Sequence, residues 1–200
     1  MPMRNRVTPL GDIVAIELRG AWLGNRGVLH ENTEIRRFHA SDLWITCRLR
    51  FRDRHMKQWQ PHHYTHLYFH DEAVSFAAGH RPCAECRRAD YNAFRAAWAQ
   101  GLDADLPRAK EMDRVLHAQR LVRGTHRRRL HRRSWRSLPS AAFVLLQDGP
   151  ARVRHDTVLP WTTSGYAEPR ARPQRGDVEV ITPPASLAAF EAGYEVQTEA

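Results

Sequence analysis

Two cysteines three positions apart, Cys83 and Cys86, constrain the fold of this chain more than any other feature of its sequence. A tight Cys-x-x-Cys turn can place both sulfurs about 2.3 Å from one zinc ion. The second cysteine then falls in the first turn of the next helix, whose dipole favours a thiolate. A redox pair would instead follow a β-strand, whereas here a predicted helix and Gly79 come first. The pattern therefore favours structural zinc over a redox pair or inert core thiols.

The residues before this turn resemble part of a known module. A predicted strand ends at Phe69, a short helix carries Glu72-Ala73 and ends in Ala77-Ala78-Gly79, and Arg81-Pro82 leads into the cysteines. Over about residues 64–98 this order is similar to the second half of the zinc-binding module of the Ada methylation-repair family, which is also an accessory in several nucleases. The resemblance implies that Cys83 and Cys86 are the second pair of zinc ligands, in a treble-clef-like knuckle that leads into a helix.

The first ligand pair of that family does not match this chain. It is a Cys or His, three residues and a Cys, placed shortly before the strand. Here the only upstream cysteine is Cys47, and Leu43 stands four positions before it. The methyl-accepting cysteine of the Ada family belongs to this first pair, so direct methylphosphotriester repair is not expected. The resemblance implies a zinc-stabilised fold associated with DNA.

A structural zinc ion takes four ligands, so Cys47 and one histidine are expected to complete the site. Residues 28–30 and 45–48 are predicted to pair as neighbouring strands, which makes His30 the first candidate. For any one histidine, a surface or hydrogen-bonded role is the more common alternative. The other candidates are His39, His55 and His80.

The apolar pattern predicts an α+β fold, with β-rich N-terminal and C-terminal regions flanking a helical, cysteine-bearing middle. Alternation along the strand expected at residues 44–51 places Cys47 on an apolar face. Helices are expected from Asp71 to Gly79, from the knuckle to about Gln100 and over 109–122, and Ser186 is expected to cap a short closing helix. We expect residues 1–102 to hold the β-hairpins and the zinc knuckle. Residues 103–200 are expected to hold a helix, a basic segment and the C-terminal strands, in one compact unit with the first region.

The charge of the chain, +9 from 31 basic and 22 acidic residues, favours a polyanionic partner such as nucleic acid. Nearly all of this charge is arginine, a bias that GC-rich coding sequence also produces. Residues 123–136 hold seven arginines and no acid, a segment suited to a phosphate backbone, and its tryptophan could stack on a base. The candidate contacts are Arg123, Arg127, Arg128, Arg129, Arg132, Arg133 and Trp135.

Signals for catalysis are weaker. Asp113 and His117 are four apart on a predicted helix, hence on one face, and Arg120 follows. Such a group could bind a metal or move a proton in phosphodiester or glycosidic cleavage, although Asp/His pairs at this spacing are common on ordinary helices.

These features predict a cytoplasmic, zinc-stabilised protein that binds nucleic acid, expected to be DNA, in repair or processing. One alternative is a DNA-processing hydrolase, either a nuclease or a glycosylase. Another is a zinc-stapled scaffold whose basicity reflects codon usage. No run of about 18 apolar residues is present, so no membrane span is expected. Three cysteines are too few for a disulfide framework and suit a reducing compartment.

Overall fold

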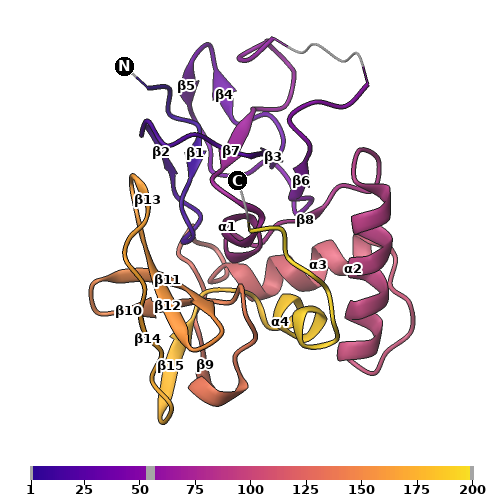
Figure 1. The fold of residues 1–200 in the computed structure, drawn as a ribbon. Coiled ribbons are helices and arrows are strands. Elements are labelled where there is room, and N and C mark those ends of the chain that lie inside the picture. The colour runs from indigo at the N-terminus through magenta and orange to yellow at the C-terminus, as the bar shows by residue number, and fades with distance from the viewer. Residues whose placement is uncertain (1, 53–56, 199–200) are drawn as a thin grey trace.

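The computed structural model describes residues 2–52 and 57–198. Their strands form three sheets and combine with four α-helices, so the predicted α+β class is confirmed. Figure 1 shows the strand-rich N-terminal region, a second sheet built from the C-terminal part of the chain, and α1 between the two regions. In the described part, no helix is long and apolar enough to cross a membrane.

The N-terminal sheet has six strands in the order β2-β1-β7-β3-β6-β8. Most neighbours are antiparallel, but β1 pairs with β7 and β6 pairs with β8 in parallel. A separate two-stranded hairpin joins β4 (His30–Glu31) to β5 (Glu34–Ile35). The strands of the sheet are β1 (Arg6–Val7), β2 (Ile13–Val14), β3 (Trp22–Asn25), β6 (Ile45–Cys47), β7 (Leu67–Phe69) and β8 (Arg81–Pro82).

Helix α1 (Glu72–Ala77) and helix α3 (Ala109–Arg120) begin where the sequence signals predict. In α1 the Asp71 side chain accepts a hydrogen bond from the Val74 backbone N–H at 2.8 Å, as an N-cap does. Gly79 has a φ of +85°, a conformation that glycine adopts without strain. Helix α2 (Arg88–Gly101) comes between α1 and α3 in the chain.

The closing helix α4 (Pro184–Glu191) begins earlier than expected. Pro183 is its N-cap and Pro184 occupies the first helical position, where a missing N–H has no cost, so the expectation that Ser186 caps the helix is wrong. Helix α2 packs closely on α4: a Cβ placed on Gly101 would lie 2.2 Å from the carbonyl oxygen of Ala188.

The C-terminal sheet has seven strands, in the order β13-β12-β11-β10-β15-β9 with β14 also paired to β12. The basic segment enters this sheet, since β9 pairs antiparallel with β15 and a single 3-10 turn (Trp135–Ser137) follows. The strands are β9 (His131–Ser134), β10 (Phe143–Leu146), β11 (Gly149–Arg154), β12 (Thr157–Thr162), β13 (Gly165–Tyr166), β14 (Arg170–Ala171) and β15 (Asp177–Val180).

One hydrophobic core connects the two parts of the chain. Its buried side chains include Phe69 and Phe76 from the N-terminal half and Phe143 and Phe190 from the C-terminal half. The rings of Phe76 and Phe190 lie 5.1 Å apart, edge to face. The sheets and helices on both sides of residue 102 therefore share one apolar interior.

In two respects β6 departs from what its sequence suggests. Trp44 and Thr46 are buried, whereas Ile45 and Cys47 are only half-buried, so the face carrying Cys47 is the more open one. The predicted pairing of residues 28–30 with 45–48 is also wrong. Cys47 pairs with Leu23 of β3, and His30 turns back on Ile35 within its own hairpin.

Candidate metal centre

The position of Cys47 is fixed by two neighbouring strands. In β6 it stands opposite Leu23 of β3, and the preceding Thr46 stands opposite Pro82 of β8. The backbone N–H of Cys83 donates to the carbonyl oxygen of Thr46 at 3.0 Å. Because β8 ends directly before Cys83, this parallel pairing brings the knuckle to the end of β6.

The knuckle itself is a compact turn. The backbone N–H of Glu85 points at the sulfur of Cys83 at 3.4 Å, and the N–H of Arg87 donates to the Cys83 carbonyl at 3.2 Å. Helix α2 starts at Arg88, so Cys86 lies in the turn before the helix, whereas the sequence pattern predicts a place in its first turn. Amide groups aimed at a thiolate are typical of such turns.

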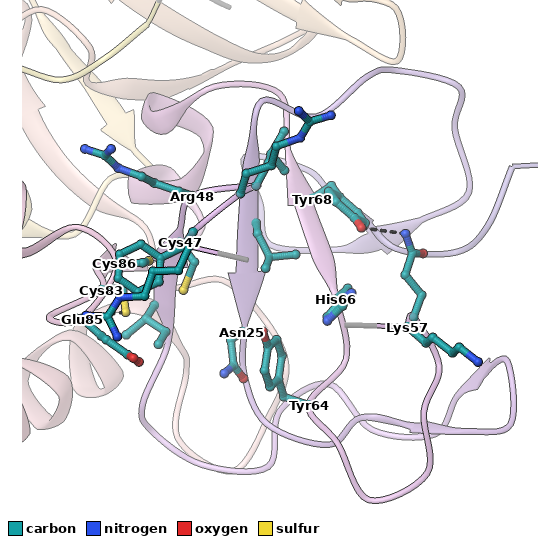
Figure 2. Close-up of a pocket in the computed structure, with 17 residues that line it drawn as sticks. Asn25, Cys47, Arg48, Lys57, Tyr64, His66, Tyr68, Cys83, Glu85 and Cys86 are labelled. Atoms are coloured by element: carbon teal, nitrogen blue, oxygen red, sulfur yellow. Dashed lines mark hydrogen bonds between the residues drawn. The ribbon is translucent and has the colours of Figure 1, made fainter. Parts of the chain in front are cut away.

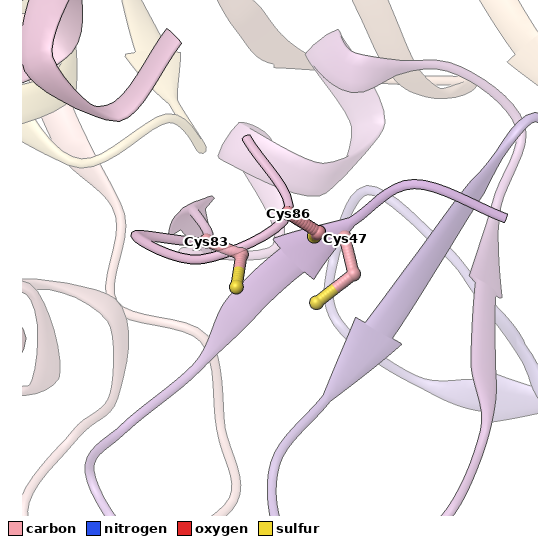
Figure 3. Close-up of side chains that lie close together, drawn as sticks. All are labelled: Cys47, Cys83 and Cys86. Atoms are coloured by element: carbon pink, nitrogen blue, oxygen red, sulfur yellow. The ribbon is translucent and has the colours of Figure 1, made fainter. Parts of the chain in front are cut away.

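The three sulfurs of Cys47, Cys83 and Cys86 lie within 4.8 Å of one another (Figure 3). Cys83 and Cys86 are buried, Cys47 is half-buried, and all three are free thiols. Hydrogen bonds from the neighbouring thiols lower the pKa of Cys83, and the same contact raises the pKa of Cys47. Three thiols this close cannot all ionise alone, whereas a bound divalent cation would hold all three as thiolates. The group is therefore able to hold a metal ion.

A buried ion pair fixes the strand that leads into the knuckle. Arg81, in β8, makes two hydrogen bonds to the Asp113 carboxylate of α3, at 2.7 and 2.8 Å. Both side chains are almost fully buried. This two-point contact connects the strand that carries the knuckle to α3.

A cavity of about 890 Å³ lies against the cysteines. Figure 2 shows the three cysteines at one end and Lys57, His66 and Tyr68 toward the other. Arg48, Arg50, Arg52 and Lys57 supply positive charge, and Glu85 is the one carboxylate among its described lining residues. The aromatic lining residues are Phe51, Tyr64 and Tyr68.

The histidines expected near the metal lie elsewhere or outside the described residues. The Nδ1 atom of His30 is 2.6 Å from the hydroxyl of Thr65, and His30 is not part of the close cysteine group. His39 packs its ring on Trp44, and His80 receives the Nε–H of Arg26 at 3.2 Å. His55 lies outside the described residues. The prediction of His30 rests on a strand pairing that the fold does not contain.

The side chains of Asp113 and His117, the predicted catalytic pair, do not form the contact that their helix spacing suggests. Asp113 is held by Arg81, and among the described hydrogen bonds none connects it to His117. His117 instead accepts from Arg120, whose Nη2 lies 2.9 Å from its Nδ1. Arg120 is fully buried and also donates to the carbonyl oxygens of Gly79 and Asp42.

The basic segment is divided between surface and interior. Arg123, Arg127, Arg129 and Arg132 are exposed. Arg133 pairs with Glu191 at 2.8 Å, and Arg128 turns inward to donate to the carbonyl oxygens of Ala77 and Ile181. Trp135 is 5% exposed and belongs to the hydrophobic core, so the expectation that it stacks on a base is wrong. Leu138, three positions later, is also buried, and this apolar pair within a polar run is the sequence signal for a core role of Trp135.

Comparisons with protein-family models, curated proteins and solved structures found no match. The chemistry of the cysteine group and its surroundings is therefore the basis for a functional argument. Two features were not anticipated from the sequence. One is the basic cavity against the thiols, and the other is a set of buried arginines around Trp44.

Proposed function

We propose that this chain is a zinc-stabilised protein that binds DNA in the cavity beside its three cysteines. The observation that carries the proposal is the lining of that cavity, which combines four basic side chains with three aromatic rings beside the cysteines. Positive charge follows a phosphate backbone, and exposed aromatic faces stack on bases of any sequence. The volume of about 890 Å³ is large enough to take more than a single small ion.

Zinc is the metal that best fits the donor set. Three close thiolates form a soft, sulfur-rich site, which zinc prefers and which magnesium or calcium avoids. The resemblance of residues 64–98 to the second half of the Ada-type module supports the same choice. In this proposal the metal holds β6, the knuckle and the start of α2 together, and so fixes one wall of the cavity.

The exposed arginines of the basic segment are a second place where DNA could make contact. Arg123, Arg127 and Arg132 are exposed and have no ion pair among the described residues. Their role would be sequence-independent phosphate contact, with the cavity adding contacts to bases. The two surfaces can be separated experimentally because they share no residue.

The test is the affinity of the zinc-loaded chain for labelled single-stranded DNA, duplex DNA and RNA over a range of salt concentrations. We expect the affinity to fall as the salt concentration rises. A triple variant with Arg48, Arg50 and Arg52 replaced by glutamine should have a lower affinity. It should also have a lower slope of log affinity against log salt concentration, because each lost phosphate contact reduces that slope by about 0.7–0.9. The matched control replaces exposed Arg37, Arg154 and Arg175 with glutamine, which removes the same charge elsewhere.

If both triple variants lost the same affinity, the loss would be explained by net charge alone, and this would contradict the cavity as the binding site. Loss only on replacing Arg123, Arg127 and Arg132 would move the contact to the basic segment. The absence of binding to every nucleic acid at low salt would refute the proposal and leave the scaffold alternative.

A further inference from the structure

Five arginines are almost fully buried in the described part of the chain, and three of them pair with a carboxylate. The remaining two, Arg26 and Arg120, form no ion pair with any described residue. A buried cation without a counter-ion is costly, so most proteins pair it. The three pairs are Arg81–Asp113, Arg87–Glu72 and Arg152–Asp71.

Both unpaired guanidinium groups lie against the same buried ring. The Cζ atoms of Arg26 and Arg120 are 4.0 Å and 3.8 Å from the centroid of Trp44, which has no exposed surface. The cation–π contact attracts each charge, but it does not neutralise either one. Trp44 thus gathers two positive charges in the interior.

A third guanidinium adds to this positive region. After burial, the charge of Arg128 is the largest influence that lowers the pKa of Arg120, and it also lowers the pKa of Arg26. Burial lowers the pKa of Arg120 to about 8 and that of Arg128 to about 9, which shows how strongly the surroundings disfavour their charge. A Cβ on Gly79 would lie 2.6 Å from the Cδ of Arg120 and 3.1 Å from the Nη1 of Arg128, so the absence of a side chain there leaves room for both.

Several nitrogens of these three arginines lack a partner. The Nη2 of Arg26, the Nε of Arg120, and the Nε and Nη1 of Arg128 are buried and make no hydrogen bond among the described residues. Arginine N–H groups are donors only, so the missing partners must be acceptors. A single oxyanion offers several acceptors and a negative charge together.

A surface pocket reaches this region. It has a volume of about 430 Å³, and Asp12, His126, Arg127 and Arg128 are among its lining residues. Gly11 lies between two of the lining residues, Leu10 and Asp12, and a Cβ placed on Gly11 would be 3.7 Å from the unpartnered Nη2 of Arg26. Arg26 is not among the lining residues, so a small ligand that entered the pocket would contact Arg128 directly and would approach the donor edge of Arg26 past Gly11, which has no side chain.

Three histidines from separate segments surround the same arginines. The ring of His39 lies 5.1 Å from that of His117 and 6.1 Å from that of His126. His117 accepts a hydrogen bond from Arg120 through Nδ1, which leaves its Nε2 as a donor. Burial lowers the pKa of His39 and of His117, so both are neutral at pH 7 and add no charge to the arginines.

We infer that Arg26, Arg120 and Arg128, together with His39, His117 and His126, form a binding site for a phosphate group. Phosphate matches the site because it carries up to two negative charges and offers oxygens in several directions to planar guanidinium forks. The site is separate from the cysteine cavity and shares no lining residue with it. The inference does not depend on the proposed DNA binding, because its ligand is a small anion that enters a different pocket.

The experiment titrates the zinc-loaded chain with inorganic phosphate at constant ionic strength, following the imidazole NMR signals and the unfolding temperature. We expect saturable shifts of the His39, His117 and His126 signals, and a rise in unfolding temperature that saturates with them. The variant Arg128→Gln should raise the Kd for phosphate about tenfold, since it removes one charge-assisted contact. Because Arg128 also donates to the carbonyl oxygens of Ala77 and Ile181, its replacement could disturb the fold, so the exposed His126→Gln is the second variant, with an expected several-fold rise.

The matched control is Arg154→Gln, an exposed change that should leave the Kd unchanged. A nucleoside monophosphate that binds more tightly than inorganic phosphate would identify a nucleotide as the source of the group, and equal binding would identify free phosphate; both outcomes support the site. Sulfate that matches phosphate in every shift, or shifts that rise linearly without saturation, would overturn it. Neither result bears on DNA binding in the cysteine cavity, which the arginine triple variants test.

Discussion

At the scale of single residues, we expect different effects on metal affinity from replacing Cys47 and from replacing His30. Cys47 lies within 4.8 Å of both knuckle sulfurs, whereas the Nδ1 of His30 is engaged with Thr65. Replacing Cys47 with serine should lower the metal affinity at least about tenfold, because a hard hydroxyl is a poor substitute for a thiolate. The measurement is competition with a chromophoric chelator, starting from fully zinc-loaded protein.

The matched control for that experiment is His30→Gln, which should leave the affinity unchanged. A loss in His30→Gln equal to that in Cys47→Ser would contradict the geometry of the cysteine group. Less than one zinc per freshly purified chain, with no loss of stability on chelation, would argue against a structural metal altogether.

At the scale of elements, the join between α1 and β8 depends on Gly79. Its φ of +85° is unfavourable for a residue with a side chain, and a Cβ there would meet the Cδ of Arg120 at 2.6 Å. We expect Gly79→Ala to lower the free energy of unfolding by about 2–4 kcal/mol, which combines backbone strain with a buried clash. Urea unfolding followed by circular dichroism measures it.

Gly124 offers the control at the same scale. It has a φ of +74°, but a Cβ placed on it would have no atom of the described residues within 4 Å. Gly124→Ala should therefore cost only the backbone term, about 1 kcal/mol. If the two alanine variants were equally stable, the close packing of Arg120 against Gly79 would not matter for the fold.

The same elements show what the sequence could and could not predict. Helix α1 and the start of α3 were predictable because their signals are local: a capping Asp71, a stopping Gly79 and a periodic apolar face. The strand β8 was not predictable, because Arg81-Pro82 has no strand propensity and becomes a strand through its parallel pairing with β6. Because that pairing is not visible in the sequence, Cys47 could be placed near the knuckle only on the ground that it is the one other cysteine of the chain. The strand predicted to pair with it, residues 28–30, is the wrong one.

At the scale of the whole molecule, the arginines illustrate a further limit of sequence reading. The seven arginines of residues 123–136 predict a basic surface, yet Arg128 turns inward and joins the nearby Arg120 and Arg26, which is distant in sequence. Charge along the chain is additive, but burial is decided by tertiary packing. The positive interior around Trp44 therefore appears only when β6, α3 and the loop before β9 come together.

That interior makes the stability of the whole molecule depend on pH through His80. It is fully buried, stands between the rings of Trp44 and Phe69, and faces Arg26, Arg120 and Arg128. Burial, together with these cations, lowers the pKa of His80 well below 6.5. Below pH 6.5 the unfolded chain therefore binds more protons at this position than the folded chain, so the free energy of unfolding falls as the pH falls, by at most about 1.4 kcal/mol per pH unit.

The comparison that isolates this effect is between the original chain and His80→Gln, unfolded by urea from pH 7.5 down to about pH 5, the range in which an ordinary histidine takes up its proton. Glutamine keeps an acceptor for Arg26 but does not titrate. The loss of metal on acidification, and the opposite contribution of Glu72, whose pKa is raised by burial, are present in both proteins and cancel in the difference. We expect the original chain to lose stability faster than the variant below pH 6.5, whereas parallel curves would show that His80 is not held neutral by the cations around Trp44.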